Sequence, residues 1–548
     1  MKILMKIKAQ KKYFSKAIYT SCYLFLLTLF LYFMLQQGYS VIACNTPKEL
    51  REMNTVAFAH RFAYLDNPYS ASVLMHEIPV VTSIYGLLVP LVMSPFIRLL
   101  SFTHLSALQI CELLTLIIEL IGTVYFYQLA LRKTGNHLFS LAGAFLFHTC
   151  YWRYAAFGGA FPDQWGLALS IVLMNRLHAD EQNQHYHPLL YAGYLISLFY
   201  IKQYFALLAI GLCAYLLFHS VKDLKKLILY GILLSGISVV LVYLLFPLYF
   251  TEVFPVAHGQ TITGDPSYSI KQIIRLSMYY APVVLFTVTR LVVNIHNLIK
   301  HRQFRFHKVT YEFCQISLIL LPLFLIAENQ GTNYTYYLQL WFPYIILYGV
   351  VFASDALTYL RQKIALPVCI SNPGTLLPVV SSVLICLVTL LSLARVLPSY
   401  HSEPMTHEQQ QAWDNAYDIL DRCSCEGEIL VSMLLSDYCL ERGIATSNYG
   451  QAEYNHSGNL ENYRNNKLWR NIFLFDDTEK LLQKNILYNQ TVRDKVYAQS
   501  YRCIALAYAG EYHLSEEDYA NAGYRAIASE ELTAGTQCWH IVFYVPAD

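Results

Sequence analysis

The stretch Ala17–Leu35 reads AIYTSCYLFLLTLFLYFML and holds no charged residue. A helix rises about 1.5 Å per residue, so a stretch of this length crosses the roughly 30 Å apolar core of a bilayer. The basic segment Met1–Lys16 precedes it, and Gln36, Gln37 and Gly38 follow it. A cleaved signal peptide has a shorter apolar core and a small-residue cleavage site. We therefore expect an uncleaved first transmembrane helix.

The whole chain has the composition of a membrane protein. Of its 548 residues, 55% are apolar and only 14% are charged, a balance that is rare in soluble proteins of this length. The formal net charge is +2, and beyond the first segment Lys and Arg form no dense block. We therefore expect the lipid bilayer as a partner and exclude nucleic acid.

Further apolar stretches of spanning or nearly spanning length follow the first. The segment Val80–Leu100 is also apolar, but Pro90 and Pro95 interrupt it, which is typical of a broken or re-entrant helix. We predict a polytopic α-helical membrane protein with about 11 spans plus this re-entrant segment. The expected spans are 17–36, 107–131, 138–152, 164–178, 187–201, 203–219, 226–250, 276–296, 310–327, 335–354 and 376–397.

The charges of the loops predict the orientation of the chain. With the N-terminus in the cytoplasm, the basic loops all lie on the cytoplasmic side, as the positive-inside rule requires. Counting Val80–Leu100 as a full span would invert every later loop. We therefore expect a multi-pass protein of a plasma or inner membrane whose first outer loop is 37–80. The basic groups are Lys2–Lys16, Arg132–Lys133, Lys222 with Lys225–Lys226, Lys300–Lys308, and Arg361 with Lys363.

Residues 399–548 are polar and charged, so we predict that a transmembrane domain, 1–398, precedes a small extracytoplasmic α/β domain. The β-like runs are Ile429–Leu434, Asn471–Phe475, Cys503–Tyr508 and His540–Val545. The cysteines lack the paired CxxC spacing of structural zinc, so disulfides or free thiols are favoured. They are Cys423, Cys425, Cys439, Cys503 and Cys538.

The first outer loop carries two carboxylates, Glu49 and Glu52. Their spacing of three residues places them on one face of a helix, where either is a candidate base for an acceptor group. The alternative is a solvated helix start, where acidic residues suit the helix dipole. Both interpretations are open from the charge pattern.

Other polar groups gather at outer ends of the expected spans, where ionisable residues are functional candidates. In the loop that ends at Asp163, Gly158–Gly159 permits close backbone approach, while Asp163 is also a candidate helix cap. Lys202 needs a partner charge, an anionic phosphate or lipid headgroups. The candidate residues in these loops are Arg153, Asp163, Lys202, Gln203, His258, Asn333 and Tyr334.

Five short motifs occur in an order that resembles bacterial-type GT-C membrane glycosyltransferases. The resemblance is to the family-39-like class, related to protein mannosyltransferases and aminoarabinose transferases. One position departs from the pattern: Phe161 stands where the family has arginine, and nearby Arg153 is a candidate substitute. The motifs are Glu52 with His60–Arg61–Phe62 and Tyr69, Thr82–Leu91 with Tyr85, Phe161–Leu169, Lys202–Gln203, and Asn333–Tyr337.

This resemblance implies an inverting transfer of a sugar from a polyprenyl-phosphate donor to a lipid, glycan or protein acceptor on the non-cytoplasmic side. It implies Glu52 as the catalytic base and the loop residues named above as donor-phosphate or sugar ligands, with Glu49, Arg61 and Tyr85 as further candidates. No cofactor is expected. Some GT-C enzymes bind a divalent metal, but the sequence shows no compact ligand cluster, so a metal stays unassigned.

Two other classes of function are open. A transporter or flippase of lipid-linked sugars typically has internal repeats and ionisable residues within spans. We detect no internal repeat, and the candidate residues lie at outer span ends, with Glu112 and Glu119 as the exceptions inside a span. A membrane scaffold with an outer binding domain is the third class, and only the C-terminal domain supports it.

Overall fold

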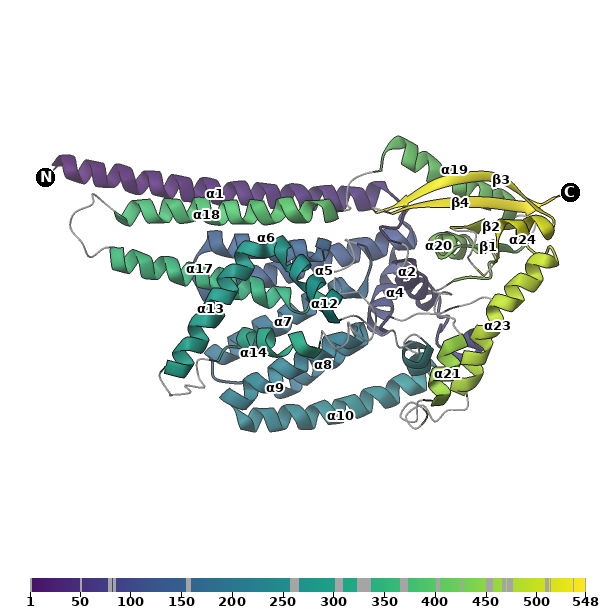
Figure 1. Ribbon diagram of the computed structural model, residues 1–548, viewed down its shortest axis with the longest axis horizontal. Helices are drawn as coiled ribbons and strands as arrows, with labels where there is room; N and C mark the ends of the chain where they lie inside the picture. The colour runs from purple at the N-terminus through teal and green to yellow at the C-terminus, as the bar shows by residue number, and fades with distance from the viewer. Residues whose placement is uncertain are drawn as a thin grey trace.

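The computed structural model describes residues 2–49, 52–76, 81, 85–153, 159–256, 266–300, 309–322, 337–364, 373–400, 405–424, 427–449, 457–465, 470, 477–507, 512, 514–535 and 537–547. Long helices run side by side through most of the molecule, and a sheet lies at the end that carries the C-terminus (Figure 1). This arrangement confirms a helical membrane protein with a small C-terminal α/β part.

The helices up to residue 399 differ widely in length. They are α1 (Lys2–Ala43), α2 (Glu52–Ala63), α3 (Ala71–Leu74), α4 (Leu88–Leu100), α5 (Ala107–Thr134), α6 (His137–Arg153), α7 (Pro162–Gln182), α8 (Pro188–Ile201), η2 (Gln203–Leu207), α9 (Leu208–His219), α10 (Val221–Leu245), α11 (Tyr249–Thr251), η3 (Glu252–Val256), α12 (Pro266–Ser277), η4 (Met278–Tyr280), α13 (Ala281–Lys300), α14 (Tyr311–Leu318), α17 (Phe342–Ile364), α18 (Pro373–Val396) and η6 (Leu397–Ser399).

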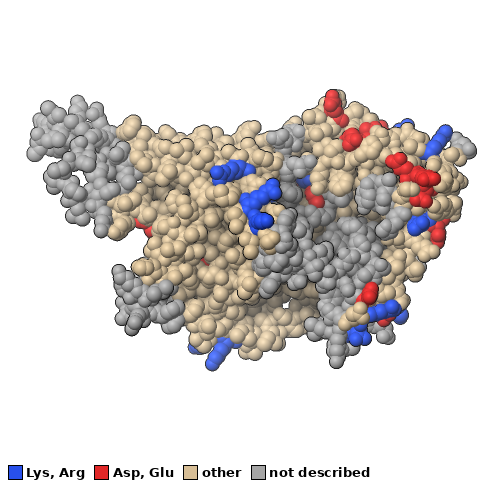
Figure 2. Space-filling view, in the orientation of Figure 1, with Lys and Arg blue, Asp and Glu red and all other residues tan. Residues whose placement is uncertain are grey.

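Within the described residues, 6 helical stretches are long and apolar enough to cross a membrane, by length and composition. The visible face of the bundle is largely free of charged side chains, whereas acidic and basic side chains gather over the C-terminal domain (Figure 2). Each expected span overlaps a helix, although the predicted stretch 203–219 is divided into η2 and α9. The total of eleven spans stays a prediction.

The segment expected to be re-entrant contains α4, which has 13 residues. At about 1.5 Å per residue it is roughly 20 Å long, which is short of the bilayer core. Pro90 lies in its first turn, where the missing N–H costs nothing, and Pro95 lies inside it. The length of α4 therefore agrees with a segment that does not span the membrane alone.

The C-terminal domain is built on one mixed sheet. Its strands are β1 (Ile429–Val431), β2 (Cys503–Leu506), β3 (Tyr524–Ala534) and β4 (Gln537–Pro546), in the order β1-β2-β4-β3. Strands β1 and β2 are parallel, with Leu430 opposite Ile504, and the other pairs are antiparallel. Its helices are α19 (His407–Ser424), α20 (Met433–Arg442), α21 (Ser457–Asn465), α23 (Asp477–Tyr497) and α24 (Glu516–Asn521).

The sequence located three of these strands and missed β3. The run at Ile429–Leu434 is a strand only to Val431, after which α20 begins, and Asn471–Phe475 lies outside the described residues. Strand β3 is at the sheet edge and is largely exposed, so it carries Glu530 and Glu531 and has no apolar run. Among the described residues no disulfide joins Cys423, Cys439, Cys503 and Cys538, and Cys425 lies outside them.

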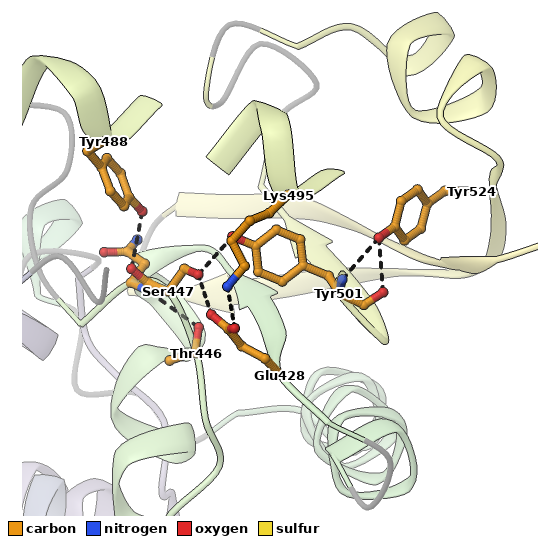
Figure 3. Close-up of polar contacts among 8 residues, drawn as sticks. Glu428, Thr446, Ser447, Tyr488, Lys495, Tyr501 and Tyr524 are labelled. Atoms are coloured by element: carbon orange, nitrogen blue, oxygen red, sulfur yellow. Dashed lines mark hydrogen bonds and ion pairs between the residues drawn. The ribbon is translucent and has the colours of Figure 1, made fainter. Parts of the chain in front are cut away.

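A polar network joins α23 to the segments beside β1 and β2 (Figure 3). The Lys495 ammonium pairs with the Glu428 carboxylate. The other carboxylate oxygen of Glu428 accepts a hydrogen bond from Ser447 Oγ at 2.6 Å, and Tyr501 Oη lies 2.8 Å from the same hydroxyl. The charges and hydroxyls of this network are paired with one another, so we regard it as structural.

Gly86 provides a test of the packing between the segment before α4 and the end of α8. A Cβ atom on Gly86 would lie 2.1 Å from the Tyr200 carbonyl oxygen and 2.2 Å from that of Ile201. Because backbone atoms cannot move aside cheaply, we expect Gly86→Ala to lower the free energy of unfolding by about 1–3 kcal/mol. Thermal unfolding of the purified protein in detergent measures the change.

The matched control is Gly193→Ala in α8, where a Cβ would meet no atom within 4 Å. We expect that variant to be as stable as the wild type, or more stable by up to about 1 kcal/mol because alanine favours helix. Equal stability of the Gly86 variant and the wild type would contradict the close contact.

Candidate active site

Glu52 is the first residue of α2, and its side chain is fully buried. Its Oε2 accepts a hydrogen bond from the backbone N–H of Lys48 at 2.7 Å, and its Oε1 accepts one from the backbone N–H of Ala160. A Cβ atom on Gly159 would lie 2.9 Å from the carboxylate. Only glycine therefore permits the carboxylate to lie against this backbone, which confirms the close approach expected there.

Burial raises the pKa of Glu52 above its ordinary value of 4.5. The two backbone hydrogen bonds, the charge of Lys48 and a hydrogen bond with Glu112 oppose this effect without cancelling it. A carboxylate with a raised pKa is a stronger base than an exposed one. Glu52 is therefore a buried carboxyl group with a raised pKa that two backbone N–H groups hold in place.

The segment Gly159–Asp163 connects Glu52 to a second polar cluster. Gln164 Nε2 donates a hydrogen bond to the Gly159 carbonyl at 2.7 Å, which holds the segment against the start of α7. Pro162 occupies the first position of that helix, and Asp163 follows in its first turn. The N-cap residue is Phe161, so the alternative that Asp163 caps the helix is wrong.

Asp163 and Lys202 form a buried ion pair. Lys202 Nζ lies 3.0 Å from Asp163 Oδ1 and 2.8 Å from Oδ2, and the Asp163 side chain is fully buried. Tyr204 Oη and Gln339 Nε2 also donate to the Asp163 carboxylate. Lys202 Nζ lies 4.9 Å from the centre of the Tyr85 ring. The sequence left three partners open for Lys202: a charged side chain, an anionic phosphate or lipid headgroups. The structure shows the first of these, the carboxylate of Asp163.

Other carboxyl groups lie near Glu52. Glu112 of α5 is buried, and its carboxyl lies within hydrogen-bonding reach of Glu52. Helix α20 of the C-terminal domain packs on α2 and brings buried Asp437 near Glu52. Burial is the main cause that raises the pKa of Asp437, and the nearby charges of Glu441 and Glu52 add to it. The Glu441 carboxylate accepts a hydrogen bond from the first N–H of α5, at Ala107.

The C-terminal domain therefore closes over the first loop. Met433 of α20 packs in one apolar cluster with Met53 and Val56 of α2. A second cluster joins Tyr463 and Leu481 of the C-terminal domain to residues of the first loop and of α8. These contacts fix the position of Asp437 relative to Glu52.

Three of the predicted residues have other surroundings. Glu49 precedes α2, because the helix begins at Glu52, so the expected shared helical face is wrong. Arg61 pairs with Asp66 at 2.6 Å and lies over the Tyr449 ring of the C-terminal domain. Arg153 donates to Tyr279 Oη at 3.2 Å and to Ser399 Oγ at 3.3 Å, and stacks on the Tyr279 ring.

The remaining predicted residues divide into two groups. Tyr85 lies within the cluster of Asp163 and Lys202, with its ring against that of Phe161. Gln203 opens η2 directly after Lys202, and its side chain faces the Tyr249 hydroxyl. His258, Asn333 and Tyr334 lie outside the described residues.

Several residues of the site were not predicted from the sequence. Tyr204 directly follows the motif Lys202–Gln203, and Gln339 lies two residues after Asn333–Tyr337. Extending these two motifs by a few residues would have found both side chains. Glu112 was noted as an ionisable residue inside a span but was not assigned to the site. Asp437 had no local signal, since its approach to Glu52 depends on the packing of two domains.

The described part of the chain offers no group of three or more His, Cys, Asp or Glu side chains arranged to hold a metal ion.

No protein-family model matches the sequence, and no curated protein matches it. ArnT from Cupriavidus metallidurans in the apo state matches with a TM-score of 0.54 and 11% identity, over 94% of this chain and 97% of ArnT. ArnT bound to undecaprenyl phosphate matches with a TM-score of 0.53 and 10% identity, over the same shares of 94% and 97%. An oligosaccharyltransferase from Archaeoglobus fulgidus matches with a TM-score of 0.49 and 11% identity, over 96% of this chain and 74% of that one.

Identities this low show a shared fold. The chain shares the fold of the two ArnT structures, as the resemblance to GT-C membrane glycosyltransferases implied. The fold that the sequence motifs predicted is thereby confirmed.

The raised pKa of Glu52 predicts how its substitution changes stability with pH. Below its ordinary value of 4.5 the carboxyl is protonated in the folded and unfolded chains, so its titration adds nothing. As pH rises, folding keeps Glu52 from ionising, and the wild type loses stability relative to Glu52→Gln. The loss grows by about 1.4 kcal/mol per pH unit until the pH passes the raised pKa.

We expect the thermal midpoint of Glu52→Gln, minus that of the wild type, to increase from acid to neutral pH in detergent. Glu479→Gln is the control, because the Glu479 side chain is 45% exposed and pairs with Arg464 at the surface. A difference that stays constant or decreases as pH rises would contradict the burial argument.

Proposed function

We propose that the protein is an inverting membrane glycosyltransferase that moves a sugar from a polyprenyl-phosphate donor to a lipid, glycan or protein acceptor. The observation that carries this proposal is that a buried carboxylate, Glu52, contacts the short segment Gly159–Asp163, whose last residue forms the ion pair with Lys202. The fold shared with ArnT over 94% of the chain supports it, because one ArnT structure holds undecaprenyl phosphate.

In the proposed reaction Glu52 removes the proton from the acceptor hydroxyl. The freed oxygen forms a bond to the anomeric carbon of the sugar, while the bond from that carbon to the phosphate oxygen breaks. The electron pair of the broken bond stays on the polyprenyl phosphate, which leaves as a stable anion, so no second carboxyl is needed as an acid. One displacement inverts the anomeric centre.

Lys202 is proposed to face the donor phosphate. Its side chain is 15% exposed, and its ammonium is held by Asp163 on one side and by the Tyr85 ring on another. A cation that is already oriented stabilises charge on the leaving phosphate without further reorganisation. We propose donor-binding roles also for four further residues, Arg153, His258, Asn333 and Tyr334. The binding of a divalent metal is a separate proposal, to which no residue is assigned.

The base role of Glu52 is tested by turnover of a panel of polyprenyl-phosphate sugars with purified protein. Glu52→Gln keeps the side-chain shape but cannot accept a proton, so we expect turnover to fall by about 10²–10⁴-fold. Glu479→Gln serves as the surface control. Loss of turnover in Glu49→Gln instead of Glu52→Gln would move the base role to Glu49.

The same assay separates the enzyme from the transporter class. A transporter or flippase would move the lipid-linked sugar across sealed proteoliposomes without consuming it. Transfer by the wild type to no acceptor, with every donor recovered intact, would contradict the glycosyltransferase proposal.

We also propose that the N-terminus is cytoplasmic and the C-terminal domain extracytoplasmic. Cys538 is an exposed thiol in this domain and reports its side of the membrane. In sealed vesicles whose outer surface corresponds to the cell exterior, we expect a membrane-impermeant maleimide to label the wild type more strongly than Cys538→Ser. Labelling of Cys538 only after the vesicles are opened would reverse the orientation.

A further inference from the structure

Glu112 is a buried carboxyl that the proposed reaction does not use. It lies in the first third of α5, is 1% exposed, and is within hydrogen-bonding reach of Glu52. Neither of its oxygens accepts a hydrogen bond from any N–H or O–H among the described residues. Two carboxylates in contact away from water repel strongly, so one of the two keeps a proton.

Charged and titratable groups face this pair from each neighbouring element. Lys48 and Cys44 face Glu112 from the segment that joins α1 to α2, and Lys48 Nζ donates to Ser40 Oγ at 3.0 Å. Cys111 precedes Glu112 on the same helix. Helix α20 adds two more carboxyls, Asp437 and Glu441, near Glu52 and Cys111. Of these groups Lys48 alone is a cation, and it balances a single negative charge.

We propose that Glu112 is a positioning residue that holds one proton and donates it in a hydrogen bond to the carboxylate of Glu52. The inference rests on the base role proposed for Glu52. The carboxylate then accepts three hydrogen bonds, from Lys48 N–H, Ala160 N–H and the Glu112 hydroxyl, which fix its orientation. The third bond stabilises the ionised form and so offsets part of the burial that raises the pKa of Glu52.

Helix α5 supplies a matched control. Glu119 lies seven residues further along the same helical face and is also fully buried. Its Oε2 accepts a hydrogen bond from Gln37 Nε2 at 3.1 Å, so its described partner belongs to α1 rather than to the site. Glu119→Gln therefore removes a buried carboxyl from the same helix without touching Glu52.

The first measurement is independent of turnover. Infrared spectra of the purified protein at neutral pH, in water and in deuterium oxide, report carboxyl groups that keep a proton. We expect the difference between wild type and Glu112→Gln to contain a protonated-carboxyl band that shifts in deuterium oxide. A difference that contains only carboxylate bands would overturn the proposal, whether or not the protein transfers sugars.

The second measurement is the pH dependence of transfer, in which the acid limb reports protonation of Glu52. Glu112→Leu removes the donated hydrogen bond, so we expect the midpoint of this limb to rise by about one pH unit. Glu112→Gln keeps an N–H donor in the same place. We therefore expect its midpoint to stay near that of the wild type and its transfer rate to exceed that of Glu112→Leu. Glu119→Gln should leave the midpoint unchanged.

The sign of the shift separates the alternatives. If Glu112 were ionised, both of its variants would remove a negative charge beside Glu52 and lower the midpoint. If Glu112 only filled space, its variants would lower the rate equally at every pH. Either result overturns the positioning role. If the infrared difference contains a protonated-carboxyl band but the wild type transfers no sugar, the proposed function is rejected. The conclusion that Glu112 holds a proton beside Glu52 then still stands.

Discussion

The contact between the Glu52 carboxylate and the backbone of Gly159 and Ala160 is the interaction on which the candidate site depends. It joins two segments more than a hundred positions apart, the start of α2 and the start of α7. Because Asp163 follows in the first turn of α7, the same contact sets the distance between the proposed base and the ion pair with Lys202. A side chain at position 159 would separate these elements, so the glycine there is a geometric requirement of the site.

Buried charges of this kind are costly, and their pairing explains how the fold retains them. Asp163 has no contact with water, yet Lys202, Tyr204 and Gln339 together donate to both of its oxygens. Such an arrangement contributes little net stability compared with apolar residues, but removing one partner leaves an uncompensated charge. The cost is consistent with function rather than stability. The same reasoning applies to Glu52, whose burial is offset by two backbone donors and, in our proposal, by the proton on Glu112.

The sequence predicted the parts of the molecule that depend on local patterns. Runs of apolar residues located the helices of the bundle, because a bilayer demands such runs wherever the chain crosses it. Of the residues that the short motifs marked, the structure brings Asp163, Lys202 and Tyr85 together, and Glu52 contacts the segment that leads to Asp163. Arg153 was the candidate substitute for the family arginine that Phe161 replaces, and its guanidinium packs on the Tyr279 ring. Asp437 was beyond prediction, since its approach to Glu52 follows from packing between distant elements. The edge strand β3 was missed because an exposed strand needs no apolar face.

Our central claim is a proposal: Glu52 and Lys202 face a single donor site at the end of the bundle beneath the C-terminal domain. The most direct test is a cryo-electron microscopy structure of the protein with a non-hydrolysable phosphonate analogue of a polyprenyl-phosphate sugar. The claim predicts that the phosphonate lies on the Lys202 side of the segment Gly159–Asp163 and that the anomeric carbon faces Glu52. An analogue bound at the opposite end of the bundle, or near the middle of the spans and away from Glu52, would contradict it.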